Sequence, residues 1–206
     1  MFKISKTFKA EMGHIVTTQK LPDIYPCKCK NFHGHSFKFI AEIYGKLNPE
    51  TGMLIDYTML TPFKEFIDNF LDHSFIVAEK DKDVLQRLII LQEILLRNNY
   101  PKIELTYRSF LDPVVKHLKL HYSDIVLADE LSIQRKDTVT IIKGVNAVTA
   151  ETLSVVLSAV LANELFLATS RYKKFVGEIQ KARVIVKETE NTDAACEPFP
   201  IYELTE

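Results

Sequence analysis

The 206-residue chain has only three cysteines, carries almost no net charge and contains no long uninterrupted hydrophobic run. Three cysteines, an odd number in a chain of this length, do not form a disulfide framework, so reduced thiols are expected. With 26 basic and 27 acidic side chains, the sequence also lacks the basic excess that binding to nucleic acid or to anionic membranes requires. We therefore expect no nucleic-acid partner and no membrane partner.

The sequence pattern also predicts no targeting or anchoring segment. Residues 1–10 intersperse lysines with apolar side chains, so we expect neither a signal peptide nor an anchor there. The most apolar window, residues 153–168, contains Asn163 and Glu164 and is expected to fall short of a membrane span. The sequence thus predicts a cytoplasmic protein.

The chain does contain enough apolar material for a core, since 47% of its residues are hydrophobic and 26% are charged. Its length predicts one domain, or one domain that carries an insertion. Two segments alternate with period two, which is typical of strands with one buried face. The residues on these faces are Phe8, Ala10, Met12 and His14, then His33, His35, Phe37 and Phe39.

A helical period begins after Asp56. Apolar spacing predicts helices at about 60–71, 85–95 and 153–161, and short strands at 139–142 and 182–186. Thr149 and Glu151 stand where the last helix opens, and there a side-chain acceptor and a negative charge suit exposed amides. The order of elements favours an α+β fold with an antiparallel sheet.

His33, Gly34 and His35 form the most informative triplet. Two imidazoles two residues apart on a strand point to the same face, and His14 on the preceding strand has matching parity. Three histidines with one open coordination position are typical of catalytic zinc, because the vacancy accepts substrate or water. The alternative is that these are ordinary histidines near the end of a sheet.

A second histidine pair, His117 and His121, has helical spacing. No third ligand is evident nearby, so we expect surface residues of an amphipathic segment.

A thiol and an acid–base pair accompany the histidines. Cys29 lies between Lys28 and Lys30, close to the predicted metal strand, and such surroundings lower a thiol pKa. Asp72 directly precedes His73, and an aspartate can orient an imidazole for proton transfer. Taken alone, the Asp-His dipeptide is a weak signal and is better explained as a charge pair at the C-terminal end of a helix.

Together these segments resemble the 6-pyruvoyl-tetrahydropterin synthase family. The resemblance covers residues 1–75 and about 140–190. It rests on five motifs, in order: Cys-x3-His-Gly-His-Ser-Phe, Gly-Met-Leu-Ile-Asp-Tyr at 52–57, Leu-Asp-His at 71–73, Thr-Ala-Glu at 149–151 and Lys-Glu-Thr at 187–189. It implies the tunnelling fold, an antiparallel sheet with helices on one face. In this fold, subunits form an oligomeric barrel, usually a homo-hexamer, with sites at subunit interfaces. The chain would then be a single domain, 1–206, with an insertion at about 78–145 that we expect to be an extra helix outside the barrel.

The resemblance also assigns roles to individual residues. It makes His14, His33 and His35 the zinc ligands, Cys29 the catalytic thiol, and Asp72 with His73 its proton-relay partners. Glu188 becomes the carboxylate that anchors the pterin, because it can accept two parallel hydrogen bonds from the ring edge. Thr149 and Glu151 match a motif beside the substrate pocket, although Glu151 could equally be only a helix N-terminal charge. Asp56 is expected to support the site from a strand end.

The sequence departs from the family pattern at three points, one of which is the insertion at about 78–145. The usual first histidine would stand at position 12, where the chain has Met12, whereas His14 lies two residues later on the same strand face. The cysteine is also duplicated. The spacing from Cys29 to His33 is typical of bacterial 6-carboxy-tetrahydropterin synthases, and the spacing from Cys27 is typical of the 6-pyruvoyl enzymes. We favour Cys29.

The resemblance implies a zinc-dependent lyase. It would convert 7,8-dihydroneopterin triphosphate to 6-carboxy-5,6,7,8-tetrahydropterin, acetaldehyde and triphosphate, towards queuosine. The nearest alternative is 6-pyruvoyl-tetrahydropterin synthase, which eliminates triphosphate only. Alternatives of another class are a zinc hydrolase, against which the absence of an HExxH motif counts, and a non-catalytic zinc-stabilised oligomer.

Overall fold

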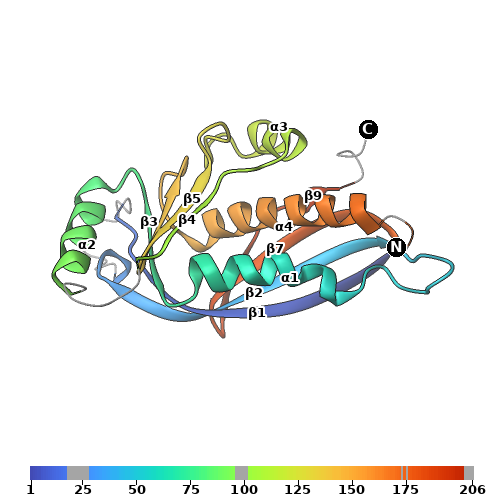
Figure 1. Ribbon diagram of the computed structural model, residues 1–206, viewed down its shortest axis with the longest axis horizontal. Coiled ribbons are helices and arrows are strands. Elements are labelled where there is room, and N and C mark those ends of the chain that lie inside the picture. Colours follow the sequence, from blue (N-terminus) through green and yellow to red (C-terminus); the bar gives the residue numbers. More distant parts are fainter. Residues whose placement is uncertain (18–27, 96–101, 173, 175, 202–206) are drawn as a thin grey trace.

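The computed structural model describes residues 1–17, 28–95, 102–172, 174 and 176–201 (Figure 1). Within these residues the chain forms, in order, β1 (Phe2–His14), β2 (His33–Lys46), α1 (Thr61–Phe66), β3 (Ser74–Ala78), α2 (Lys82–Leu95), β4 (Glu104–Tyr107), α3 (Asp112–His121), β5 (Ser132–Lys136), β6 (Val139–Lys143), α4 (Ala150–Tyr172), β7 (Glu178–Thr189), β8 (Thr192–Ala195) and β9 (Phe199–Pro200). Short 3-10 turns cover Lys28–Lys30 and Tyr57–Leu60, and a π-helical segment, Ile67–Leu71, continues α1. The α+β class is confirmed.

One sheet carries the strands in the order β4-β5-β6-β3-β1-β2-β7-β8, with β9 paired to β7. The expected antiparallel pairing holds for β1 with β2 and for β2 with β7. It is wrong for β3, which pairs in parallel with both β1 and β6. The sheet is therefore mixed, because helices or long connections separate these strands along the chain, as parallel pairing requires.

Most helical cover lies on one face of the sheet. Phe8 of β1 meets Phe63 of α1 edge to face at 5.4 Å, and Ser154 of α4 donates to the carbonyl of Val184 in β7 at 2.7 Å. Both helices lie across β1, β2 and β7 on the same side (Figure 1). The alternation read from the sequence thus places Phe37 and Phe39 in the core under these helices.

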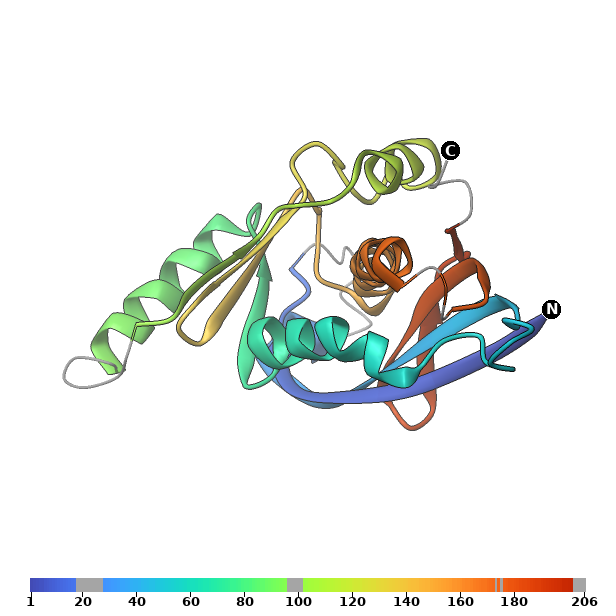
Figure 2. The ribbon, with the colours of Figure 1, turned by 45° about the vertical axis from the view of Figure 1, so that its right-hand side comes forward.

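The expectation that all helices share one face is wrong for α2. Its Leu85 and Leu88 pack on Val77 of β3 and Ile141 of β6, in a cluster separate from the main core. Successive strand residues point to opposite faces, so α2 covers the face that α1 and α4 leave open. Figure 2 shows α2 on the far side of the sheet.

The segment expected to be one extra helix contains more structure. Residues 79–143 form α2 and α3 together with β4, β5 and β6, and these strands extend the sheet from the β3 edge. The short strand predicted at 139–142 is confirmed as β6. The sequence pattern did not resolve β4 and β5, because strands of four or five residues give a weak period-two signal. His121 is exposed as expected, but His117 is half-buried and its ring lies 4.5 Å from that of Phe199.

Helix α4 runs over 23 residues with a mean hydropathy of 1.7 in its most apolar window, and so it meets a length and composition test for a membrane span. This differs from the expectation that the region falls short. However, 72% of that window is buried inside the protein. The helix is apolar on all sides because other elements surround it, as in a core helix.

Candidate active site

The pairing of β1 with β2 brings the three predicted ligands together. His14 lies directly opposite His33, and Met12 lies opposite His35, so all three imidazoles point to one face. One potential ligand atom from each histidine lies within 4.8 Å of the other two. The site therefore arises from strand register, with His14 two residues beyond the usual position at Met12.

Hydrogen bonds orient two of these rings. The Nδ1 of His14 lies 3.0 Å from the carbonyl oxygen of Val148, and the Nδ1 of His33 lies 2.8 Å from that of Asn31. Because a carbonyl only accepts, each Nδ1 carries the proton and each Nε2 presents a lone pair. Both rings are thus in the tautomer that binds a metal through Nε2.

The environment of His14 also suits a metal ligand. Its side chain is 1% exposed, and its Nε2 is buried without a hydrogen-bond partner in the described part of the chain. Burial lowers the pKa of His14 to about 4; the bond to Val148 opposes this, and the neighbouring His33 and His35 add to it. A neutral imidazole with an unused buried lone pair fits zinc, which prefers nitrogen ligands of this kind.

A cavity of about 210 Å³ opens beside His14. Four predicted site residues line it: Cys29, Thr149, Glu151 and Glu188. Cys29 lies in the 3-10 turn, where its carbonyl accepts from the amide of Val16 at 2.9 Å. The hydroxyl of Thr149 accepts from the amide of Thr152 at 3.2 Å and so caps α4.

Glu188 is the half-buried carboxylate of this cavity. Its Oε1 lies 3.7 Å from the Nε2 of His14. Burial raises the pKa of Glu188, His35 and His33 act against this, and the negative charge of Glu151 acts with it. Two carboxylates and a thiol next to three imidazoles give the cavity hydrogen-bond acceptors and groups that transfer protons.

Sequence reasoning missed part of the cavity wall. Thr192 and Asp193 line it too, carried there by the β7–β8 hairpin, in which the hydroxyls of Thr189 and Thr192 lie 2.7 Å apart. The signal available in the sequence was Asn191, a turn residue three positions after Glu188.

The predicted proton relay lies elsewhere in the chain. Asp72 accepts from the amide of Glu11 at 2.9 Å, and its Oδ2 lies 2.8 Å from the Nδ1 of His73. His73 lines a different hollow, together with Glu11 and Ser36. Glu11 and Ser36 stand on strand positions that alternate with the buried ones, so the pair is on the opposite side of the sheet from the Cys29 cavity. The predicted ligand His35 also lines this hollow. Burial raises the pKa of Asp72, but the hydrogen bonds from Glu11 and His73 outweigh it and hold that pKa below its usual value.

Two other residues discussed above do not join the cavity. Asp56 caps the 3-10 turn at Tyr57–Leu60 by accepting from the amide of Thr58 at 2.8 Å, so it supports local structure. Cys27 lies outside the described residues.

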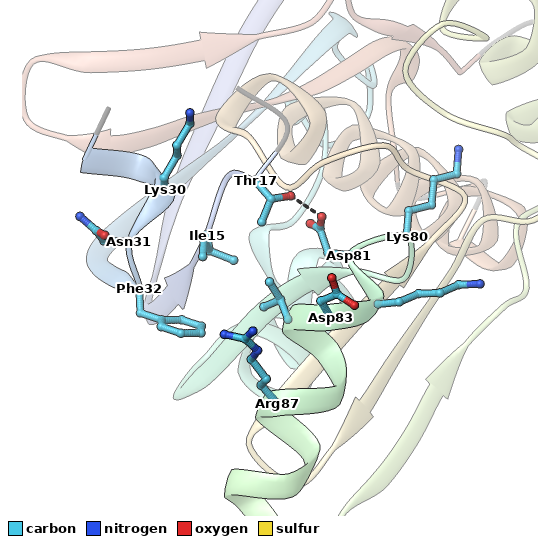
Figure 3. Close-up of a pocket in the computed structure, with 11 residues that line it drawn as sticks. Ile15, Thr17, Lys30, Asn31, Phe32, Lys80, Asp81, Asp83 and Arg87 are labelled. Atoms are coloured by element: carbon cyan, nitrogen blue, oxygen red, sulfur yellow. Dashed lines mark hydrogen bonds between the residues drawn. The ribbon is translucent and has the colours of Figure 1, made fainter. Parts of the chain in front are cut away.

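A larger hollow of about 670 Å³ lies between the start of α2 and the segments that flank the histidines. Figure 3 shows Asp81, Asp83 and Arg87 facing Ile15 and Phe32 across it, with Thr17 bonded to Asp81. Its wall mixes both signs of charge and contains none of the predicted site residues. This composition does not match one class of ligand.

Comparison with known proteins agrees with this geometry. The mixed α+β sheet has the tunnelling fold, and its two longest strands carry three histidines that could hold a metal ion. Residues 3–198 match the sequence model of 6-pyruvoyl tetrahydropterin synthase, and the chain belongs to that family. The resemblance seen in the sequence is thereby confirmed.

The named relatives match over shorter stretches. The 6-carboxy-5,6,7,8-tetrahydropterin synthase of Haemophilus influenzae is 35% identical over 98 residues, which are 46% of this chain and 65% of that protein. The putative enzyme of that name from Pyrococcus horikoshii is 39% identical over 69 residues, 34% of this chain and 41% of that protein. The matches thus span less than two thirds of both relatives.

Among solved structures, an uncharacterized protein from Wolinella succinogenes, WS1659, superposes with a TM-score of 0.54 at 23% identity. The match covers 94% of this chain and 96% of that one, and it supports the fold.

Proposed function

We propose that this protein is a zinc-dependent lyase that acts on 7,8-dihydroneopterin triphosphate. The products would be 6-carboxy-5,6,7,8-tetrahydropterin, acetaldehyde and triphosphate, on a route towards queuosine. The observation that carries the proposal is that Cys29 lines one cavity with His14 and Glu188. Cys29 is the cysteine with the bacterial 6-carboxy spacing, and named relatives carry the 6-carboxy name.

Each residue has a physical task in this proposal. His14, His33 and His35 would hold the zinc ion, which supplies Lewis-acid polarisation of the substrate side chain when bound. Glu188 accepts hydrogen bonds from the ring edge and orients it in the cavity. Cys29 removes a proton as thiolate, and Thr149 and Glu151 shape the wall beside the ring.

The proton relay must then come from another copy of the chain. Within one chain, Asp72 and His73 lie across the sheet from the cavity, whereas His73 is 79% exposed in its side chain and so is accessible to a partner. We infer a homo-oligomer, expected to be a hexamer, in which the Asp72–His73 pair of one copy completes the cavity of another.

The first test is mass spectrometry of the products after zinc-loaded protein is incubated with 7,8-dihydroneopterin triphosphate. The 6-carboxy product with acetaldehyde is the expected result. A 6-pyruvoyl product would instead assign the other branch of the family and favour Cys27 as the base. Absence of turnover with zinc bound would reject the lyase and favour the non-catalytic oligomer.

Substitution of the thiol tests its role. Cys29→Ala should lower kcat by at least a hundredfold with zinc content unchanged, because the base is lost. Cys196→Ala is the matched control, since Cys196 lies beside Ser158 of α4 and away from the cavity. Full turnover by Cys29→Ala would remove Cys29 from the mechanism.

A further inference from the structure

Arg135 of β5 is a buried cation whose hydrogen bonds all go to backbone carbonyls. It is 8% exposed. Its guanidinium donates to Asn69 at 3.0 Å, Asp72 at 2.8 Å and His73 at 3.2 Å, and to Asp137 in its own hairpin at 2.9 Å. A buried charge is retained only when most of its donors are satisfied, and these acceptors take four of the five N–H groups of Arg135.

Three of these carbonyls belong to the segment that carries the Asp72–His73 pair. Asn69 lies in the last turn of the π-helical segment, where carbonyls have no helical partner and need a cap. The side chain of Ser74 caps Leu71 at 2.7 Å, and Thr140 of β6 caps Phe70. Arg135 caps Asn69 and also donates to the carbonyls of both residues of the pair.

The pair is held from the other side by β1. The amide of His73 donates to the carbonyl of Glu11 at 2.8 Å, and the amide of Glu11 donates to the carboxylate of Asp72 at 2.9 Å. The backbone between these two supports is unusual, because His73 has a φ of 53°. A non-glycine residue stays in this left-handed region only where its surroundings determine the conformation.

We propose that Arg135 is a positioning residue for the Asp72–His73 proton relay. From the β5 side, it holds the left-handed backbone at His73. The bond between Asp72 and the Nδ1 of His73 can then form while the imidazole stays exposed. The proposal rests on the proposed function of the pair. Arginine is required because its planar fork reaches several carbonyls at once, whereas an ammonium is a single point donor.

The hydrogen bonds of Arg135 and Thr140 also indicate a structural role for the segment 79–143. Arg135 and Thr140 come from β5 and β6, the strands that extend the sheet beyond β3. Their side chains reach back to the turn that bears the relay, so this segment supports the site without lining the Cys29 cavity.

The test compares Arg135→Met and Arg135→Lys with Tyr107→Phe in the full-length, zinc-loaded protein. Tyr107→Phe is the matched control, since its hydroxyl bonds Glu164 at 2.8 Å in a buried network of the same strand group that does not touch the relay. Two measurements are made. One is kcat and KM with 7,8-dihydroneopterin triphosphate, and the other is hydrogen exchange of peptides that cover 69–75.

Arg135→Met should lower kcat at least tenfold with KM changed less than threefold, and should speed exchange at 69–75 at least tenfold relative to β2. The kcat and the exchange rate of Arg135→Lys should lie between those of Arg135→Met and the parent. Tyr107→Phe should match the parent in both measurements. If Arg135→Met does not fold, Arg135→Lys decides alone.

Hydrogen exchange at 69–75 as slow as in the parent, measured in folded Arg135→Met, would overturn the proposal. A kcat of Arg135→Met no lower than that of Tyr107→Phe would overturn it too. If the parent itself shows no turnover, the proposed function is rejected, independently of the role of Arg135. Faster exchange at 69–75 would then still support the role of Arg135 in holding the pair, and unchanged exchange would reject it.

Discussion

At the scale of single residues, Glu42 shows how a buried charge is accommodated on the sheet face away from α1 and α4. It is 4% exposed and accepts from Lys3 at 2.7 Å, Tyr44 at 2.6 Å and Arg183 at 2.9 Å. Burial alone would raise the pKa of Glu42, but these three donors outweigh it and lower that pKa to about 2. The carboxylate therefore stabilises the fold in its ionised form.

Glu42→Gln should lower the free energy of unfolding at pH 7 by about 1–3 kcal/mol, because hydrogen bonds to a charged group are lost. The folded-state pKa lies below the ordinary value of 4.5, so this contribution is complete above pH 4.5 and disappears as the pH falls towards about 2. Urea titrations of parent and variant across that range measure the difference.

The control for this prediction is Glu178→Gln, which removes an ion pair between exposed side chains of Lys46 and Glu178. It should leave stability unchanged, since exposed pairs contribute little. A constant difference between Glu42→Gln and the parent from pH 7 to pH 2 would contradict the assignment.

Glu188 is the residue on which ring recognition depends in the proposed function. Glu188→Gln should weaken the binding of a pterin by roughly tenfold or more, since the charged acceptor is lost, while zinc stays bound. Fluorescence titration measures the affinity for the pterin, and metal analysis measures the zinc content. Glu190→Gln is the control, because Glu190 is 78% exposed in its side chain and pairs with Lys38 outside the cavity.

At the scale of elements, the geometry of the candidate metal cluster depends on how closely β1 can approach its neighbours. Gly13 pairs with Gly34 between the histidine positions, and a Cβ on Gly13 would lie 2.7 Å from the ring of Phe75 in β3. Phe75 in turn packs edge to face on Phe32 at 5.1 Å. The glycine thus lets an aromatic pair pack behind the strands that carry the ligands.

Gly13→Ala should displace Phe75 or β1, destabilise the protein by about 1–3 kcal/mol, and weaken zinc binding roughly tenfold as the register shifts. Competition with a chromophoric chelator measures the affinity. Gly52→Ala is the control: its φ of 68° makes alanine costly, yet no atom lies within 4 Å of its added Cβ. It should lower stability by about 1 kcal/mol and leave zinc affinity unchanged.

At the scale of the whole molecule, the separation of His73 from the Cys29 cavity predicts complementation between subunits. Cys29→Ala and His73→Ala chains, each inactive alone, should recover activity when they are co-expressed, because some cavities then combine an intact Cys29 with an intact partner relay. Activity of the purified mixed oligomer measures this.

Co-expression of Cys29→Ala with Glu188→Gln is the matched control. Both residues line one cavity of one chain, so no mixed cavity regains both. Recovery in this control would show that Cys29 and Glu188 come from different chains. No recovery in the first pair would show that the relay and the thiol act within one chain.

The long elements were predictable because local patterns determine them. The alternation around His14 and around His33 identified β1 and β2 and the face of each histidine, and the helical period after Asp56 identified α1. The sequence also predicted that Cys29, Glu188 and Thr149 belong together, through a resemblance to a family. Their common cavity agrees with that prediction.

Other features depend on contacts between segments far apart in the chain. In the sequence, Arg135 belongs to a charged run. Its partners at Asn69 and Asp72 are 66 and 63 residues away. The parallel pairing of β3 and the position of α2 on the opposite face are likewise long-range.

The sequence by itself determined the α+β class, the three histidines of the candidate metal cluster and the strand face on which they lie, since side-chain chemistry and a period of two are local properties. Only the tertiary structure decided which strands pair with β3, and that Asp72 and His73 lie apart from the cavity that Cys29 lines. The reason is that strand order and burial come from long-range packing, for which neighbouring residues carry no signal.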